Sequence, residues 1–277
     1  MWLPFWYVDV VKWFLNDGCV DPTANDNFAI RLGSMLGHAD IVQLLLADRR
    51  ADPTAERNSA LQASSELVHT QVLKLLLADG RADPTTNNNY AIKSSSYHGN
   101  ADVVKLLLVD GRADPAVDDN YAIQWSSAEG YADVVKLLLA DERTDPTADN
   151  NIAIQVSSVR GHADVVKLLL ADARVDPTAD DNYAIGVSSH ADVVKLLLVD
   201  GRVDPTAGNN YAIRTSSKKG RADVVRLLLA DGRADPTARD NYPIRIGIKN
   251  GHVKVVKLLL ADGRADPMIP LQSCDSY

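Results

Sequence analysis

One Ser-x-x-Lys tetrad is the strongest candidate for catalytic chemistry in this chain of 277 residues. It reads Ser216-Ser217-Lys218-Lys219, and a lysine amine held beside a serine hydroxyl can activate that hydroxyl as a nucleophile. Equivalent serine pairs at 95–96, 126–127 and 157–158 are not followed by lysine. We therefore interpret the tetrad as a coincidence within a repeated element, and we predict that the protein is not an enzyme and has no catalytic residues.

Histidines and acidic tips are the candidate metal ligands, and neither set has the spacing of a metal site. Of the six histidines, His98 lies apart, and the other five share one position, once per repeat: His38, His69, His162, His190 and His252. Zinc needs about four ligands around one point, and calcium about six oxygens from one loop. The tips at 118–120, 149–151 and 180–182 supply too few, so we interpret them as solvated turns. We predict no metal and no cofactor.

A repeated apolar helix must position all of these residues. The stretch Ala132-Asp133-Val134-Val135-Lys136-Leu137-Leu138-Leu139-Ala140 recurs nine times, each copy closed by an Asp-Pro. The closing prolines lie 31 residues apart, with one gap of 28. Apolar side chains surround most of the helix axis, so each helix needs cover from neighbours. A fixed period of this length predicts a solenoid.

The ends of this helix are marked by the sequence as well. An acidic residue such as Asp133 stands in the first turn, where the helix dipole favours negative charge. Glycine usually follows the last turn, as at Gly80, which predicts a left-handed C-terminal residue. Arg49, Glu142 and Ala173 replace it in three copies, so that either the left-handed geometry persists there or the helix ends differently.

The repeat resembles the ankyrin repeat. Tyr242-Pro243-Ile244-Arg245 is similar to the Thr-Pro-Leu-His signature, and 161–170 (Gly-His-Ala-Asp-Val-Val-Lys-Leu-Leu-Leu) matches the turn and second helix. Gly232-Arg233-Ala234-Asp235 matches the following loop with one extra residue. The resemblance implies an all-α, ankyrin-type solenoid of stacked helix-turn-helix repeats. The unit has 31 residues where the family has about 33, which predicts shortened hairpin loops.

Three regions follow from the repeat boundaries. We expect an N-terminal half-repeat and cap at 1–26, eight ankyrin-like repeats at 27–267 and a C-terminal tail at 268–277. The aromatic N-terminal end either covers the first helix layer or forms a docking patch. The unit that begins at Asn182 lacks three residues after Ser189 and carries Gly186 in its first helix, which predicts a local kink or a mobile spot.

The charge and the cysteine content limit the possible functions and locations of the protein. Only Cys19 and Cys274 are present, at opposite ends of the repeat array, which favours a reducing, cytoplasmic location over a disulfide framework. No apolar run is long enough to cross a membrane. The net charge is −8, which disfavours a general nucleic-acid binder, although 214–254 carries a local +6. That basic end favours an acidic protein partner.

The resemblance also implies where partners bind. In the family, partners lie on the concave face, against the tips and the ends of the first helices. In this chain the residues at these positions differ from repeat to repeat, whereas the residues between them, which we call the frame, are nearly the same in every repeat. We predict no small-molecule substrate. The predicted partner-binding residues are Tyr97, His98, Ala128, Glu129, Val159, Arg160, Lys218, Lys219, Arg221, Lys249 and Asn250.

Aromatic residues of the first helices are assigned to packing. We expect the column of Phe28, Tyr90, Tyr121, Tyr183, Tyr211 and Tyr242 to pack between neighbouring repeats, and Trp125 to lie in the core rather than on a ligand-stacking surface.

Three functions are therefore weighed. The first is a protein-interaction scaffold that binds an unidentified protein, with an acidic partner favoured. The second is polyanion or nucleic-acid binding through the basic C-terminal repeats. The third is a truncated or decayed repeat array.

Overall fold

The structure is a computed structural model that describes residues 6–18 and 20–266. Within these ranges the chain forms 17 α-helices and no strand, as the all-α prediction required. The predictions for Cys19, Cys274 and the tail at 268–277 lie outside the described residues, and so do residues 1–5 of the predicted N-terminal cap.

The chain divides into two compact units, which are described separately. Unit 1 is Met1–Ser126 with Asp133–Asp145, and unit 2 is Ser127–Ala132 with Pro146–Tyr277. Two helices, α8 (Val117–Glu129) and α9 (Ala132–Leu139), have residues in both. Unit 1 further contains α1 (Trp6–Asp17), α2 (Ala24–Met35), α3 (Ala39–Asp48), α4 (Ala55–Glu66), α5 (Thr70–Asp79), α6 (Thr86–Tyr97) and α7 (Ala101–Asp110). Unit 2 further contains α10 (Ala148–Arg160), α11 (Ala163–Ala171), α12 (Ala179–Val187), α13 (Ala191–Asp200), α14 (Ala207–Lys218), α15 (Ala222–Asp231), α16 (Ala238–Lys249) and α17 (Val253–Asp262).

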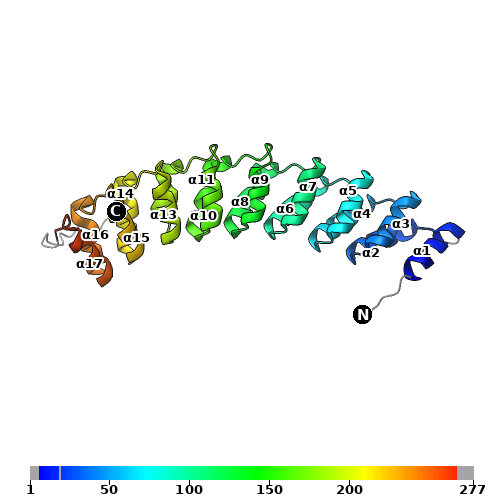
Figure 1. The fold of residues 1–277 in the computed structure, drawn as a ribbon, viewed down its shortest axis with the longest axis horizontal. Coiled ribbons are helices and arrows are strands. Elements are labelled where there is room, and N and C mark those ends of the chain that lie inside the picture. Colours follow the sequence, from blue (N-terminus) through cyan, green and yellow to red (C-terminus); the bar gives the residue numbers. More distant parts are fainter. Residues whose placement is uncertain (1–5, 19, 267–277) are drawn as a thin grey trace. The chain divides into compact units, whose positions relative to one another are not determined.

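Each unit is a two-layer helical solenoid (Figure 1). In unit 1 the first helices of the repeats, α2, α4 and α6, pack side by side, and the second helices, α3, α5 and α7, form the other layer. Unit 2 repeats this order with α10, α12, α14 and α16 against α11, α13, α15 and α17. The core lies between the layers, where side chains such as Ile92, Val103 and Leu107 are fully buried. The apolar surround of each second helix is thus satisfied by its neighbours, as the sequence predicted.

The helix ends confirm the predicted left-handed residues. Gly80 has φ +82° in this position, and Arg49 keeps the same geometry with φ +62°. By contrast, α11 ends at Ala171, and Asp172 is already extended with ψ 118°. Both alternatives that the sequence left open therefore occur, in different repeats.

The tips between repeats are the least regular part of the fold. In the first turn of each first helix, three consecutive residues adopt left-handed geometry, such as Asp118, Asp119 and Asn120 with φ +51°, +54° and +64°. Asparagine, aspartate and glycine tolerate this region best, which explains the composition of the tips. The third residue is not solvated as predicted, because Asn120 is only 7% exposed.

That third residue is an asparagine in every repeat, and it joins one repeat to the loop of the next. Asn89 Oδ1 accepts a hydrogen bond from the backbone N–H of Asp114 at 2.8 Å. The same bond, 22 to 25 residues along the chain, recurs at Asn27, Asn58, Asn120, Asn151, Asn182, Asn210 and Asn241. We call this series the asparagine ladder.

The paired serines are buried between the two helix layers. Ser95 donates its hydroxyl to the Ile92 carbonyl at 3.2 Å, within its own helix. Ser96 is fully buried, and its hydroxyl has no hydrogen-bond partner among the described residues. Ser216 is 1% exposed, so the hydroxyl of the Ser-x-x-Lys tetrad faces the interior rather than a substrate.

The shortened repeat begins with the helix α12. This helix has 9 residues where α10 has 13, and the chain leaves it in extended geometry at Ser188, with ψ 130°. Gly186 is buried, and a Cβ placed there would lie 2.9 Å from the Tyr211 ring. The deletion thus removes the last turn of the helix and its closing glycine. Mobility at this repeat stays a prediction.

Candidate functional site

Histidines at the turn between the two helices hold neighbouring repeats together. His162 Nε2 lies 2.8 Å from the carbonyl oxygen of Ala128, one repeat earlier, and donates to it. His69 and His252 make the same contact to Met35 and Lys218, each at 3.0 Å. These imidazoles are therefore structural. Among the described residues, no group of three or more His, Cys, Asp or Glu side chains could hold a metal ion.

Arg221 takes the place of the histidine where the preceding repeat is shortened. Its guanidinium donates to the carbonyls of Val187 and Ser188 at 3.0 and 3.2 Å, at the end of α12. Burial lowers the pKa of this arginine. The longer side chain reaches across the gap that the deletion leaves. Arg221 was predicted to bind a partner, but its Nη1 group serves this internal contact.

A second repeated contact uses the arginines of the loops. Arg112 forms a two-bonded ion pair with Asp110, at 2.8 Å in both bonds, and also donates to the Ala82 carbonyl of the preceding repeat. In the equivalent pair of Arg81, the hydrogen bond from the arginine is the main cause that holds the pKa of the Asp79 carboxyl group below its usual value. We call these contacts the arginine clamps. Clamps with both contacts recur at Arg50, Arg81, Arg143, Arg202, Arg233 and Arg264. At Arg174 the ion pair with Asp172 recurs.

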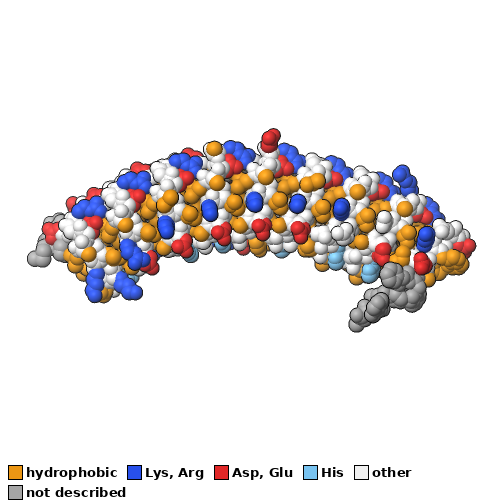
Figure 2. Space-filling view, in the orientation of Figure 1, with side chains coloured by type: hydrophobic (Ala, Val, Ile, Leu, Met, Phe, Trp, Pro, Cys, Tyr) orange, Lys and Arg blue, Asp and Glu red, His pale blue; other side chains and the backbone are white. Residues whose placement is uncertain are grey.

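The predicted partner-binding residues of unit 2 differ in their exposure and in the contacts that they make. Lys218, Lys219 and Lys249 are exposed at the ends of α14 and α16. Figure 2 shows basic side chains gathered over the end of unit 2 that holds α16 and α17. Asn250 is exposed too, although its side-chain amide donates to the Lys218 carbonyl at 2.9 Å.

The remaining predicted residues of unit 2 lie around the turn after α8 and the end of α10. Arg160 pairs with Glu129 at 2.7 Å, and Val159 beside it is 42% exposed. Ala128 is only 7% exposed, and its carbonyl is bound by His162, so it offers little surface to a partner. This placement disfavours Ala128 as a contact residue.

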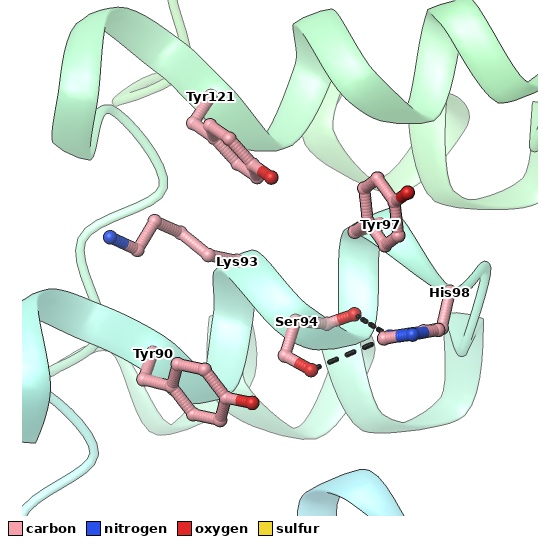
Figure 3. Close-up of a pocket in the computed structure, with 6 residues that line it drawn as sticks. All are labelled: Tyr90, Lys93, Ser94, Tyr97, His98 and Tyr121. Atoms are coloured by element: carbon pink, nitrogen blue, oxygen red, sulfur yellow. Dashed lines mark hydrogen bonds between the residues drawn. The ribbon is translucent and has the colours of Figure 1, made fainter.

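In unit 1, Tyr97 and His98 belong to an aromatic pocket that the sequence did not predict. The pocket encloses about 330 Å³ and is lined by Tyr90, Lys93, Ser94, Tyr97, His98 and Tyr121 (Figure 3). His98 Nδ1 donates to the Ser94 carbonyl at 2.8 Å, which fixes the imidazole at one wall. A second hollow of about 390 Å³ shares Tyr90, Ser94 and His98 and adds Glu66, Val68 and Asn100.

Trp125 extends this aromatic surface, contrary to its predicted place in the core. It is 36% exposed, and its ring centroid lies 5.5 Å from that of Tyr97 and 5.7 Å from that of Tyr121. Its neighbours Ile123 and Ser126 fill the interior face of α8. The i, i+4 spacing of Tyr121 and Trp125 was the available signal, because it places both rings on one face of the helix.

The tyrosine column is half-exposed rather than buried between repeats. Tyr90, Tyr183 and Tyr211 are 37%, 41% and 44% exposed. Neighbouring members are connected by basic side chains, since the Arg214 guanidinium lies 5.9 Å from the Tyr211 ring and 6.0 Å from the Tyr242 ring. The first helices therefore present a surface of tyrosine rings to solvent.

Comparison with known proteins defines the family. The sequence model of ankyrin repeats (3 copies) matches residues 89–181 and 182–270, about two thirds of the chain. Among solved structures, the crystal structure of EF0377, an ankyrin repeat protein, aligns with a TM-score of 0.42 and 21% sequence identity, covering 72% of this chain and 96% of that one. The search of curated proteins gave no match. No described helix is long and apolar enough to cross a membrane. The chain belongs to the ankyrin repeat family, whose repeats generally mediate protein–protein interactions.

Proposed function

We propose that the protein is an interaction scaffold that binds a partner protein along the ends of the first helices and the turns that follow them. The binding surface comprises Tyr97 and His98 in unit 1. In unit 2 it comprises Glu129, Val159, Arg160, Lys218, Lys219, Lys249 and Asn250. Arg221 supports this surface from within, and Ala128 contributes its backbone to the histidine contact.

The proposal rests on one contrast: the contacts between neighbouring repeats recur along the chain, whereas the exposed residues at the ends of the first helices differ from repeat to repeat. The asparagine ladder, the arginine clamps and the histidine contacts use the same atoms in repeat after repeat. The exposed ends carry a different pair in each repeat, such as Tyr97-His98, Val159-Arg160 and Lys218-Lys219. A scaffold held rigid at equivalent positions can change its end residues with little loss of stability, because substitutions at exposed positions change stability by only about 0.5 kcal/mol.

The basic end of unit 2 is the part of this surface to test first. An acidic partner would bind Lys218, Lys219 and Lys249 by charge complementarity. The triple variant Lys218→Glu, Lys219→Glu, Lys249→Glu should lose a partner captured by the intact chain from a cell extract. Arg221 is left unchanged, because its removal would leave the carbonyls of Val187 and Ser188 without their donor.

A matched control carries the same change of charge on exposed second-helix lysines: Lys105→Glu, Lys136→Glu, Lys167→Glu. Circular dichroism should show that both variants keep their helices. Loss of the partner from the first variant alone supports the proposal. Equal loss from both variants, or retention by both, contradicts the assignment of this surface.

Polyanion binding is the second function to compare. The basic stretch offers fewer available groups than its composition suggests, because Arg226 and Arg233 pair with aspartates, and Arg214 donates to the carbonyls of Gly208 and Asn209. The capture should therefore persist in the presence of heparin. Its complete loss at low heparin concentration would favour the polyanion function instead.

A further inference from the structure

The aromatic pocket of unit 1 has the chemistry of a site for an organic cation. Tyr90, Tyr97 and Tyr121 supply its walls, and the faces of such rings attract cations through their quadrupole. Ser94 and the alkyl part of Lys93 form the floor (Figure 3). Tyr97 is 39% exposed, so at least one wall is open to a ligand from solvent.

The one lysine of the pocket does not oppose a cation there. In Figure 3 its side chain extends away from Tyr97, and its ammonium lies 2.6 Å from Asp118 Oδ2 and 6.0 Å from the centroid of the Tyr121 ring. Asp118 also accepts a hydrogen bond from Asn88 at 2.9 Å, and the Lys93 bond is the main cause of the lowered pKa of this carboxyl group. The lysine charge is therefore neutralised at the edge of the pocket.

A carboxylate stands beside the pocket, next to Tyr90. Glu66 lines the adjoining hollow and accepts the Tyr90 hydroxyl at 2.5 Å. That bond uses one of its two oxygens, which leaves capacity for a further donor. The position of Glu66 beyond the Tyr90 ring suits a flat, multiply donating cation, which can lie on the ring and donate to the carboxylate at the same time.

The net charge of unit 1 also favours a cationic ligand. Unit 1 contains 12 Lys and Arg against 20 Asp and Glu, a net −8, whereas unit 2 contains 17 of each. The entire net charge of the chain thus belongs to the unit that carries the pocket. Such a field attracts basic partners and raises their association rate.

We propose that this pocket binds an arginine side chain in a basic segment of a partner protein, with the guanidinium against Tyr90 and Tyr97 and a hydrogen bond to Glu66. The inference rests on the proposed scaffold function and gives the ligand chemistry for Tyr97 and His98. Arginine fits better than lysine, because a planar guanidinium can stack on tyrosine while it donates in its own plane.

The test uses the full-length protein and synthetic peptides. A fluorescein-labelled peptide, Gly-Arg-Gly-Arg-Gly-Arg-Gly, is titrated by anisotropy beside peptides in which lysine or citrulline replaces arginine. Citrulline keeps the shape of arginine and removes its charge. We expect the arginine peptide to bind about 3-fold more tightly than the lysine peptide and about 10-fold more tightly than the citrulline peptide, as cation–π and charge-assisted bonds require.

Variants locate the site. Glu66→Gln and Tyr97→Ala should each weaken binding by about 5-fold. The matched controls are Glu142→Gln, an exposed carboxylate of the same unit, and Tyr183→Ala, an exposed tyrosine of unit 2. Both controls should bind like the unaltered chain. Circular dichroism confirms that the four variants remain folded.

Three results would overturn the proposal: equal affinity for arginine and lysine peptides, equal weakening by Glu66→Gln and Glu142→Gln, or no binding of the arginine peptide. Tighter binding of a trimethyl-lysine peptide would also overturn it, because a quaternary ammonium group cannot donate to Glu66. Any of these results would leave the capture experiment at the basic end of unit 2 unaffected, so the two proposals fail separately.

Discussion

Replacement of one asparagine of the ladder should lower the stability of the two neighbouring repeats that it connects. Asn89 is 9% exposed and accepts the Asp114 N–H at 2.8 Å, while its own φ of +56° is left-handed. Asn89→Ala therefore has two costs. Left-handed geometry costs alanine about 1 kcal/mol, and loss of the acceptor costs about 1–3 kcal/mol. We expect the free energy of unfolding to fall by about 2–4 kcal/mol.

Asn87 gives the matched control. It has the same left-handed geometry, with φ +55°, but it is exposed, and its side chain makes no hydrogen bond within the part of the chain that the structure describes. Asn87→Ala should therefore cost only the backbone part, about 1 kcal/mol. Asn89→Gly tests the other part, because glycine adopts this geometry freely and removes only the acceptor.

The assay is urea unfolding followed by circular dichroism, together with hydrogen exchange at the Asp114 amide. Exchange at that amide should accelerate about 10-fold or more in Asn89→Gly, since about 1.4 kcal/mol of local stability corresponds to that factor. If Asn87→Ala and Asn89→Ala shift the unfolding curve equally, the ladder bond contributes nothing and the argument fails.

Three further changes test the frame. Hydrogen bonds from Arg81 and from the Thr85 hydroxyl hold the pKa of Asp79 and of Asp83, respectively, below 3.8. The stabilisation from these bonds is complete above that pH and is lost as the pH falls through the lowered values. Tm should be level from about pH 7 to 5 and fall steeply below about 4, and a steady decline from pH 7 would contradict this reasoning. Ser96→Ala removes a buried hydroxyl without a partner and should raise stability by about 1 kcal/mol in urea unfolding, whereas Ser95→Ala, whose hydroxyl is bonded, should not. Val68 has φ +59° where other repeats carry glycine, so Val68→Gly should relieve about 1 kcal/mol of strain; a lower Tm would show that its side-chain contacts outweigh that strain.

The sequence by itself determined the repeat, its helices and their ends. These features depend on residues a few positions apart: the apolar run of 132–140, the glycine that follows the last turn and the Asp-Pro that prevents its continuation. The family resemblance then gave the order of the two helices in each repeat. Positions that are equivalent by period must have similar surroundings, so small serines between the layers could also be predicted.

Only the tertiary structure decided which atoms meet across repeats. Asn120 was predicted to be a solvated turn residue because its partner, the Asp145 amide, lies 25 residues away, beyond any local pattern. Trp125 was predicted to be buried because its surroundings depend on Tyr97, which the preceding first helix supplies. The role of Arg221 depends on a deletion one repeat earlier. Local spacing fixes a helix, but the stacking of repeats fixes the distances between side chains 25 to 35 residues apart, and the candidate site is built from those distances.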